Sequence, residues 1–430
     1  MPGAGGLADE TLLAVLCRSG ELGGEVSDTE WGRFVEAAHN HGVAPLLYKR
    51  LLHGGVSVPK PVLEQLRQWY LVNAARNTLL YQALGRVLQA FQQAAIPVLP
   101  LKGAHLAALV YGDVASRKMG DLDLLVRKSE LPRAASKLLE MGYTNEINGD
   151  AESIAAWCAK HPDRHHLPIF HKLPDTRIEL HWSLLDPPHP VELADPWSRA
   201  RPAIIAGVEA MVLAPEDLLL HLCLHAEHHH FRQGIRPLCD IAEVVHRWGD
   251  KLDWAYVQAQ ADRWRAGRCV YLGLWLSREL LRSPVPEAIL RGLQPQDFKV
   301  ASVLAREIVL SGTEELDGEE RAALAPWSLQ ISQPGRGRFG GWRWFWNMMF
   351  PSREHMAGYM QRRHGLSLSG LRRYSCYITR AIDVLVRMGR FWLHCGRKAI
   401  EGVRELRKTA RLRKWLRTRE PEEHSCSCKS

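Results

Sequence analysis

The sequence predicts an α+β protein, with a few short strands in the middle of the chain and helical segments on both sides of them. Apolar residues recur at the helical period from about residue 11 to 52 and from 61 to 95, and the helical pattern returns after Pro215. Between these regions, short apolar or alternating runs bounded by Pro, Gly and Asp are typical of strands. At 430 residues the chain is long enough for two or three domains.

The helix expected over residues 61–95 has the clearest apolar face, which consists of Leu79, Leu80, Ala83, Leu84, Val87, Leu88 and Phe91. Pro97 ends this helix, and residues 98–101 form a short strand candidate interrupted by Pro100. Gly103 is then expected to free the backbone for a tight turn into a helix over residues 104–111.

Residues 122–126 form a second strand candidate, and a helix is expected over 130–141 with Ser129 as its N-cap and Gly142 just past its end. Two more strands are expected over 166–173 and 176–182, joined by the turn-like Pro174-Asp175. The last strand alternates an apolar face with a polar one, namely Ile178, Leu180 and Trp182 against Arg177, Glu179 and His181.

Beyond Pro215 the pattern predicts helices over residues 216–230, 238–248, 254–282 and 296–310, then a loop rich in Gly, Arg and Trp over 333–351 and a last helical region over 372–419. These elements suggest four parts. They are an N-terminal helical segment (1–75), a core with the strands (76–200), a helical domain (201–325), and an aromatic loop followed by a basic helical region (326–430).

Two carboxylates, Asp121 and Asp123, stand one residue apart at the start of the strand candidate 122–126. Residues i and i+2 of a strand point to the same side, about 6.6 Å apart. Because like charges at that spacing repel, the arrangement requires a cation or an exposed position. Glu179 projects to the same side if its strand is the neighbour, and three carboxylates suit hard cations such as Mg²⁺. The sequence therefore predicts a divalent-metal site made of Asp121, Asp123 and Glu179.

A phosphate site is expected just upstream of these carboxylates. The Lys102-Gly103 turn leads into a helix whose first free N–H groups attract a phosphate.

The order of these motifs resembles a known family. An apolar strand, an LKG turn, a helix, a Tyr, the pattern R-x-x-x-D-x-D-L-L-V, a later I-E-L-H-W strand and the helical stretch L-L-H-L-C-L-H-A resemble the uncharacterised nucleotidyltransferases of the polymerase-beta-like superfamily. The resemblance runs from about residue 12 to 248. It implies a small mixed β-sheet core flanked by helices, with Asp121, Asp123 and Glu179 as the metal-binding triad.

The resemblance also implies a reaction. A hydroxyl of an acceptor attacks the α-phosphate of a nucleoside triphosphate, with two Mg²⁺ ions, and pyrophosphate leaves. The acceptor is left open between a small molecule, a sugar, a peptide and a protein side chain. Lys102, Gly103, Ala104 and Arg117 are the expected triphosphate-binding residues. Many superfamily members have Gly-Ser at the turn where this chain has Gly103-Ala104, so phosphate binding here rests on the backbone and a cation.

Several of these residues have a second interpretation. Lys102 also fits a solvated turn lysine, and Arg117 also fits a structural partner of Asp113 or Asp121. His181 lies on the strand face of Glu179, where it either reaches the site or supports it by hydrogen bonds.

A row of histidines marks the helix expected over residues 216–230. His221, His225 and His229 recur every four residues, with His228 and His230 beside them and Asp240 downstream. This spacing suits a zinc or hydrolase site, but the H-E-x-x-H pattern is absent, and packing or substrate contact is favoured.

The remaining features concern the location and the C-terminal part. The start of the chain lacks the features of a signal peptide, and no run of about 18 apolar residues suggests a membrane span, so a cytoplasmic protein is expected. The nine cysteines show no disulfide or CxxC zinc spacing. The net charge is +9, and Lys and Arg far outnumber Glu between Arg397 and Arg419.

The basic segment Arg397–Arg419 carries Ile400, Val403, Leu406, Leu412, Trp415 and Leu416 among its charges. It fits a helix that packs on the domain, or one that binds nucleic acid or anionic lipid. The aromatic cluster of Trp342, Trp344, Phe345, Trp346 and Phe350 fits a core anchor or a partner surface better than a base-stacking platform. The tail with His424, Cys426 and Cys428 fits disorder better than a weak metal site. Two rivals to the enzyme are therefore a catalytically silent nucleotide-binding module and an adaptor that acts through its basic C-terminal helix.

Overall fold

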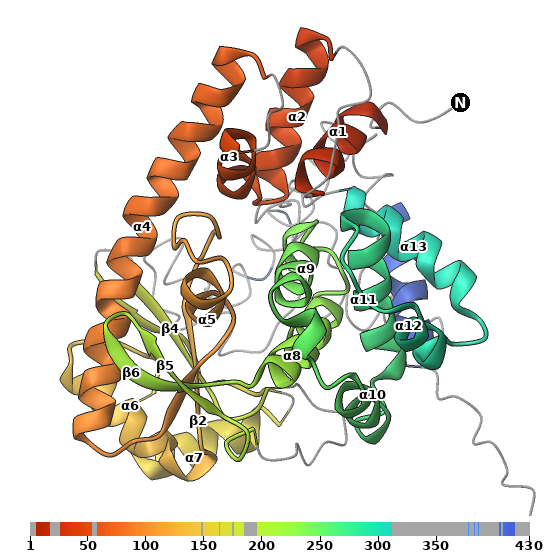
Figure 1. Ribbon diagram of the computed structural model, residues 1–430. Coiled ribbons are helices and arrows are strands. Elements are labelled where there is room, and N and C mark those ends of the chain that lie inside the picture. The colour runs from red at the N-terminus through yellow and green to blue at the C-terminus, as the bar shows by residue number, and fades with distance from the viewer. Residues whose placement is uncertain are drawn as a thin grey trace, which may run out of the picture. The chain divides into compact units, whose positions relative to one another are not determined.

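A long helix and a small mixed sheet organise the N-terminal part of the chain (Figure 1). The computed structural model describes residues 6–17, 26–53, 58–147, 149–162, 164–173, 176–184 and 196–311, and in the C-terminal part residues 377, 382, 386, 404–405 and 407–417. The chain divides into two compact units, Met1–Gly312 and Thr313–Ser430. The sheet and helices α1 to α13 belong to the first unit, and the division into four parts stays a prediction.

The first four helices are α1 (Gly6–Leu16), α2 (Asp28–Asn40), α3 (Ala44–His53) and α4 (Lys60–Gln93). Helix α4 packs against α2 and α3 and also against the sheet (Figure 1). The predicted apolar face of α4 is buried in the main core, with Leu84, Val87 and Phe91 fully enclosed. Leu79 is the exception, because 57% of it is exposed.

Four strands form the sheet in the order β1 (Val98–Pro100), β2 (Leu122–Val126), β4 (Thr176–His181) and β3 (Phe170–Lys172). Strands β2 and β4 are parallel, whereas β1 and β3 run antiparallel to their neighbours, so the sheet is mixed. One face carries Leu122, Leu124, Ile178 and Leu180 and belongs to the same core as α4 and α6 (Leu131–Glu140). The predicted α+β class and mixed sheet are confirmed.

Two local predictions were wrong, and one was confirmed. The strand expected over residues 166–173 is reduced to β3, with a separate bridge between His166 and His181, because Pro168 has no N–H for the ladder. Ser129 lies inside a 3-10 turn, η1 (Lys128–Glu130), so it does not cap α6. Gly142 does follow α6 in the left-handed conformation, with φ of +83°.

Three elements in this region were not predicted. Helix α7 (Ala151–Lys160) starts at the N-cap Asp150, whose side chain accepts a hydrogen bond from the Ser153 N–H. A hairpin of β5 (Arg201–Ile205) and β6 (Val208–Val212) packs with β6 against β1.

The helices after the hairpin are α8 (Pro215–His228), α9 (Arg236–Trp248), η2 (Gly249–Lys251), α10 (Trp254–Arg263), α11 (Gly267–Leu281), α12 (Glu287–Leu293) and α13 (Phe298–Leu310). The single helix expected over residues 254–282 is in fact α10 and α11. Arg265 separates them in the left-handed conformation, with φ of +50°, and a helix cannot continue through such a residue.

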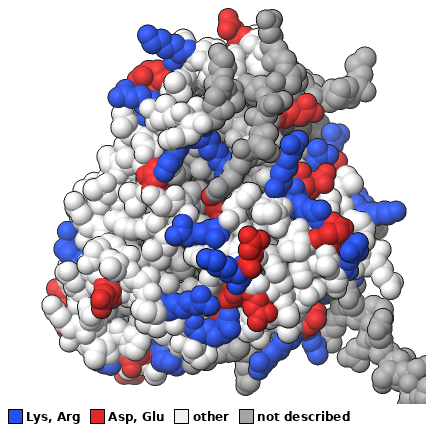
Figure 2. Space-filling model, in the orientation of Figure 1, with Lys and Arg blue, Asp and Glu red and all other residues white. Residues whose placement is uncertain are grey.

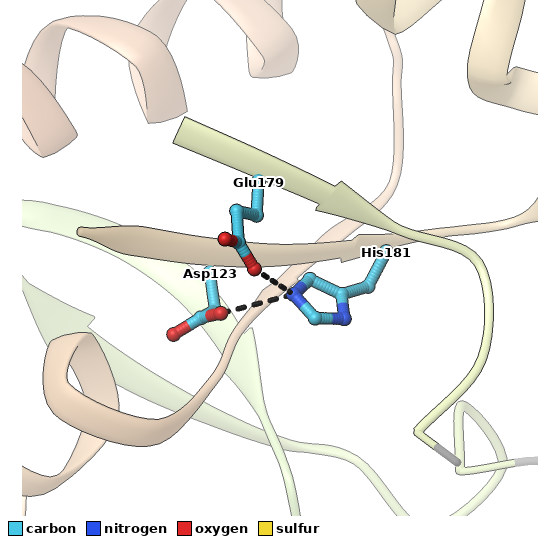
Figure 3. Close-up of side chains that lie close together, drawn as sticks. All are labelled: Asp123, Glu179 and His181. Atoms are coloured by element: carbon cyan, nitrogen blue, oxygen red, sulfur yellow. Dashed lines mark hydrogen bonds and ion pairs between the residues drawn. The ribbon is translucent and has the colours of Figure 1, made fainter. Parts of the chain in front are cut away.

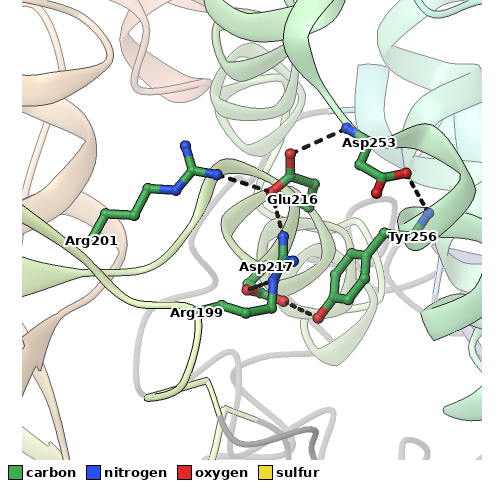
Figure 4. A network of polar contacts seen from close by, with 6 residues as sticks. All are labelled: Arg199, Arg201, Glu216, Asp217, Asp253 and Tyr256. Carbon is green, nitrogen blue, oxygen red and sulfur yellow. Dashed lines mark hydrogen bonds and ion pairs between the residues drawn. The ribbon is translucent and has the colours of Figure 1, made fainter.

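A polar network ties the start of α8 to α10 and to the chain before β5 (Figure 4). Arg199 donates from Nε to Asp217, at 3.0 Å, and from Nη2 to Glu216, at 2.7 Å. The hydroxyl of Tyr256 donates to Asp217 at 2.7 Å, and the backbone N–H of Asp253 donates to Glu216 at 3.2 Å. Both carboxylates are buried, so Arg199 supplies the charge that keeps them there.

Some sequence predictions fall in the C-terminal part of the chain. The loop 333–351, its aromatic cluster and the His424-Cys428 tail lie outside the described residues. Within the basic segment, residues 407–416 are helical, with Leu412 buried and Arg411 exposed.

Two general predictions concern cysteines and membranes. Five cysteines are described, and all are free: Cys17, Cys158, Cys223, Cys239 and Cys269. Of the helices in the described part of the chain, none combines the length and the apolar character that crossing a bilayer requires.

Candidate metal and nucleotide site

The face of the sheet opposite the apolar core carries the acidic residues. Asp123 on β2 stands directly opposite Glu179 on β4 in the parallel register, which meets the condition that the two strands are neighbours. Asp121 comes just before β2, and its charge acts on both of these carboxylates. Residues 56 positions apart in the sequence therefore share one patch because β2 and β4 are paired.

Asp123 is the most deeply placed of the three acidic residues, with a side chain 3% exposed. Lys102 Nζ lies 2.7 Å from Asp123 Oδ1, and His181 Nε2 lies 2.9 Å from the same oxygen. Burial opposes the charge on Asp123, but Lys102 and His181 outweigh it and hold the pKa of this carboxyl well below its usual range. Lys102 is therefore an ion-pair partner of Asp123 and not a solvated turn lysine.

Asp121 is in the opposite situation. Burial and the neighbouring charges of Asp123 and Glu179 raise the pKa of Asp121 to about 6. The patch thus holds more negative charge than Lys102 and His181 neutralise, which is the electrostatic setting of a cation site.

His181 joins the two facing carboxylates (Figure 3). Its Nε2 also lies 3.3 Å from Glu179 Oε2. Because carboxylates only accept hydrogen bonds, Nε2 carries a proton in this arrangement. Burial opposes the charged ring, but the hydrogen bonds to Asp123 and Glu179 raise the pKa of His181 above its usual value. These hydrogen bonds place His181 at the carboxylates and fit both roles considered for it, reaching the site and supporting it.

The residues fit a divalent cation. Ligand atoms of Asp123, Glu179 and His181 all lie within 4.8 Å of one another, and among the described residues this is the group with that property. Carboxylate oxygens suit Mg²⁺, Ca²⁺ and Mn²⁺, whereas an imidazole suits transition metals. Asp121, the third residue of the predicted triad, is not part of this group, and neither are the α8 histidines.

The start of α5 (Lys102–Leu109) lies beside the carboxylates. Lys102 has the left-handed conformation, with φ of +43°, which is unusual for a residue with a side chain. Gly103 does not have such a conformation, so its expected role in the turn was wrong. A Cβ on Gly103 would lie 2.6 Å from Arg117 Nη1 and 2.8 Å from Met119 Cγ, so glycine is needed for close packing.

No side chain caps the start of α5, although this region is fully described. Ala104 is buried in the core, and its carbonyl accepts a hydrogen bond from the Tyr81 hydroxyl at 2.7 Å. Any contact of Ala104 with a ligand therefore comes from its backbone N–H. The first turn of α5 offers such N–H groups next to Lys102.

Arg117 forms a buried ion pair with Asp240 of α9. Nε lies 3.1 Å from Oδ1, Nη2 lies 2.8 Å from Oδ2, and Nη1 donates to the carbonyl of Lys118. The hydroxyl of Tyr111 also donates to Asp240, at 2.8 Å. The sequence had suggested Asp113 or Asp121 as the structural partner of Arg117, but the structure pairs Arg117 with Asp240 instead. Asp113 instead accepts from Ser116 and pairs with Lys49.

The histidines of α8 face the same site. Burial and the charge of Lys102 lower the pKa of His221 to about 3, and His181 and Asp123 also act on it. His221 is 2% exposed, and among the described residues neither of its ring nitrogens has a hydrogen-bond partner. Burial, His228 and Lys102 lower the pKa of His229 to about 3 as well. This row of histidines is therefore neutral and lies within electrostatic reach of Lys102.

Sequence reasoning missed two groups near the site. Arg236, the first residue of α9, has its pKa lowered by burial and by the neighbouring Arg117, and it also senses Asp121. His165 and His166 have rings 4.9 and 5.3 Å from the ring of His181. The bridge between His166 and His181 is out of the regular β3–β4 register, so the sequence pattern does not predict it. The position of Arg236 depends on how α9 packs.

The comparison with family models agrees with this geometry. The model described as "Uncharacterised nucleotidyltransferase" matches residues 27–282, which is more than half of the chain. The chain belongs to this family. No significant match was found among curated proteins, and none among solved structures.

Membership in the uncharacterised nucleotidyltransferase family fits the site as described. The matched region contains the sheet, Asp121, Asp123 and Glu179, the start of α5 and helices α8 and α9. It ends at the C-terminus of α11, so the basic C-terminal segment lies outside the match. The family indicates transfer of a nucleotidyl group as the general chemistry and a nucleotide as substrate.

Proposed function

We propose that this protein is a Mg²⁺-dependent nucleotidyltransferase that moves a nucleoside monophosphate from a nucleoside triphosphate to a hydroxyl acceptor. The observation that carries the proposal is the register pair of Asp123 and Glu179, with Asp121 beside it and Lys102 on its flank. This arrangement places a site for divalent metal ions next to Lys102, whose ammonium group can bind phosphate. Nucleotidyl transfer, which the family indicates, requires both.

Asp121, Asp123 and Glu179 are the residues that would hold the divalent ions, and two ions are expected. When bound, such ions neutralise the charge of the triphosphate and stabilise the leaving pyrophosphate. His181 donates its Nε2 proton to Asp123 and Glu179, which fixes the orientation of both carboxylates. We assign His181 a positioning role.

The triphosphate is expected on the side of β1 and α5. Lys102 and the backbone N–H groups of Gly103 and Ala104 are available there, and a helix start attracts phosphate oxygens. Arg236 supports this placement, because a second buried cation held next to Arg117 is favoured by a nearby anion. Arg117 was predicted to bind the triphosphate, but its contacts with Asp240 suit it better to hold the loop before β2.

In the transfer step, the acceptor oxygen forms a bond to the α-phosphorus as the bond from that phosphorus to the bridging oxygen of the β-phosphate breaks. Pyrophosphate leaves with the electron pair, and the proton of the hydroxyl is released to water. The protein supplies position and charge, which account for most of the catalysis in phosphoryl transfer.

One observation favours the silent nucleotide-binding module as a second candidate. Lys102 and His181 contact the same oxygen of Asp123, and two basic groups can neutralise a carboxylate without a metal. This candidate predicts nucleotide binding that is independent of Mg²⁺, with no release of pyrophosphate.

The deciding experiment follows α-phosphate label from each of the four nucleoside triphosphates into a cell extract, with Mg²⁺ or with EDTA. We expect Mg²⁺-dependent transfer by the wild type and loss of at least about a hundredfold, roughly 2.7 kcal/mol, in Asp123→Asn and in Glu179→Gln. Glu140→Gln, at an exposed position on α6, is the matched control and retains full activity. Full activity of either site variant would refute the assigned site.

Removal of the basic C-terminal segment separates the enzyme from the adaptor. A chain that ends at Gly396 should keep transfer activity, since the matched region ends at residue 282. Loss of the cellular function together with intact transfer would support the adaptor instead.

A further inference from the structure

A cavity of about 550 Å³ lies next to β3, the strand that pairs with β4 and its Glu179. It is formed where the strand expected over residues 166–173 is interrupted, and His166, Pro168 and His171 line one side of it. Trp157 and His161, from α7 and its C-terminal end, line another side. Cavities of this size commonly hold small molecules. None of the contacts assigned above to the metal ions or the triphosphate uses these residues.

Two of the lining residues, His166 and His171, lie on the carboxylate face of the sheet. In an antiparallel pair, residues directly opposite each other project to the same face. His171 is opposite Arg177, and His166 is opposite His181. Arg177, Glu179 and His181 are every second residue of β4, so all three lie on one face of it. Adjacent strands are about 4.8 Å apart, so the cavity begins one strand away from Glu179.

The cavity also lies across the carboxylates from the phosphate side. The strand order is β1, β2, β4, β3, with Lys102 directly after β1 and the cavity at β3. The attacking and leaving oxygens of the transferred phosphorus are roughly in line, on opposite sides of it. If pyrophosphate leaves toward Lys102, the attacking hydroxyl comes from the side of β3.

The lining suits a neutral molecule rich in hydroxyl groups. The rings of Trp157 and His161 are stacked face to face, with centroids 4.5 Å apart and planes at 26°, so the ring surface that this pair leaves toward the cavity is apolar. The Nδ1 atoms of His161 and His166 lie 2.9 and 2.7 Å from backbone carbonyls, so each Nδ1 carries a proton. In a neutral ring Nε2 is then an acceptor, which matches the O–H donors of a hydroxylated ligand and repels an anion.

Two exposed lining residues add both kinds of hydrogen-bonding group. Glu146 supplies acceptor oxygens, and Arg164 supplies a fork of donors. A flat ring with donors and acceptors around it is the complement of a sugar, which has C–H faces and hydroxyl groups at its edge. A peptide would instead require an extended groove or a free strand edge.

We propose that this cavity is the acceptor site and that the acceptor is a polyhydroxylated ring of the sugar type. The inference rests on the proposed function and names its acceptor class. The ring packs on the Trp157 and His161 surface, Glu146 and Arg164 bind its hydroxyls, and one hydroxyl points toward Glu179. The oxygen of this hydroxyl forms the new bond to the α-phosphorus as pyrophosphate leaves, and the hydroxyl proton is released to water.

Binding is tested without catalysis, by saturation-transfer NMR of the full chain with a panel of methyl glycosides, and with serine and tyrosine peptides as the comparison. We expect at least one glycoside to receive saturation and the peptides to receive none. The double variant Glu146→Gln, Arg164→Gln should raise the Kd of the glycoside about tenfold or more. Both substitutions are at exposed positions, so the fold is retained, and Glu140→Gln is the control. Trp157→Phe should keep binding, whereas Trp157→Ala should weaken it.

The outcomes separate this inference from the proposed function. If no glycoside binds, or if the double variant binds it as the wild type does, the sugar acceptor site is wrong, even where label transfer to the extract is observed. If the double variant raises the KM of the nucleoside triphosphate and leaves the glycoside unaffected, the cavity belongs to the nucleotide and the inference is also wrong. If a glycoside binds but no nucleotide is transferred, the proposed function fails and only the sugar site remains.

Discussion

Arg117 and Asp240 form a bidentate ion pair that joins the loop before β2 to helix α9. The pair is buried, with 12% of the Arg117 side chain and 4% of the Asp240 side chain exposed. It fixes the loop that leads into Asp121 and Asp123, and it does so from a part of the chain 123 residues away. The carboxylate patch therefore depends on the packing of α9 as well as on the sheet.

Arg117→Lys should lower the unfolding free energy by roughly 3 kcal/mol, because a lysine cannot make both contacts and Asp240 is left partly unpaired in the interior. Denaturant unfolding measures this loss. Arg133→Lys, at an exposed ion pair of α6, should change stability by less than about 1 kcal/mol. An unchanged stability of Arg117→Lys with a large rise in the KM of the nucleotide would restore the predicted role of Arg117 in phosphate binding.

Gly103→Ala should displace Arg117. The added Cβ would lie 2.6 Å from Nη1 of Arg117, which is held by the carbonyl of Lys118 and cannot retreat freely. We expect a cost of about 1–3 kcal/mol, measured by thermal unfolding. Gly120→Ala is the matched control, since nothing lies within 4 Å of a Cβ there. Equal melting temperatures for the two variants would contradict the close packing at Gly103.

Asp121→Asn should stabilise the metal-free protein at neutral pH. The raised pKa of Asp121 shows that its charge is disfavoured by burial, Asp123 and Glu179, so removing the charge relieves repulsion worth about 1–3 kcal/mol. Unfolding in EDTA is the measurement, and Asp250→Asn, at an exposed position, should have little effect. The same Asp121→Asn variant should gain less stability than the wild type when Mg²⁺ or Mn²⁺ is added. A destabilised metal-free variant would show that Asp121 is needed for the fold and not for a cation.

Arg199→Ala should be strongly destabilising, whereas Arg201→Ala should not. Glu216 and Asp217 have side chains 4% exposed, and Arg199 contacts both of them. Its loss leaves two buried carboxylates with fewer partners, at a cost of about 2–4 kcal/mol. Arg201 is 59% exposed and lies 4.0 Å from Glu216, so its removal should cost less than about 1 kcal/mol. Similar unfolding curves for the two variants would argue against the network of Figure 4 as the anchor of α8.

Stability should fall in mild acid partly because of His41. This residue is 3% exposed, its Nδ1 accepts a hydrogen bond from the Ile235 N–H at 3.3 Å, and burial lowers its pKa to about 4. The unfolded chain binds this proton near pH 6.5, so the contribution is complete above that pH and is lost as the pH falls from about 6.5 to about 4. The full loss is up to about 3 kcal/mol.

The His41 contribution can be isolated by comparing wild type and His41→Gln in denaturant at several pH values. The difference in unfolding free energy between the two should shrink as the pH falls toward 4. His53→Gln, at an exposed position on α3, is the control and should keep the pH dependence of the wild type. A constant difference between wild type and His41→Gln would exclude the titration of His41 as the cause.

Surface charge around the junction of the sheet with α8 and α9 is mixed. On the face shown in Figure 2, Lys and Arg side chains lie over this region together with Asp and Glu side chains. The surface there therefore does not present charge of a single sign.

The sequence by itself determined the elements with strong local signals. The apolar face of α4 and the strand β2 follow from periodicity, and the spacing of Asp121 and Asp123 follows from the geometry of a strand. Signals of one or two residues were less reliable. Ser129 lost its capping role because the chain forms a 3-10 turn there, and the hairpin of β5 and β6 has no strong turn motif apart from Gly207.

Only the tertiary structure decided which side chains meet. The pairing of β2 with β4 sets Glu179 opposite Asp123, and it brings His181 onto the same oxygen as Lys102. The packing of α9 selects Asp240 as the partner of Arg117. These contacts join residues far apart in the sequence, and they depend on strand register and helix docking. Local periodicity reports which face of an element is buried, but it does not report which residue of another element lies against that face.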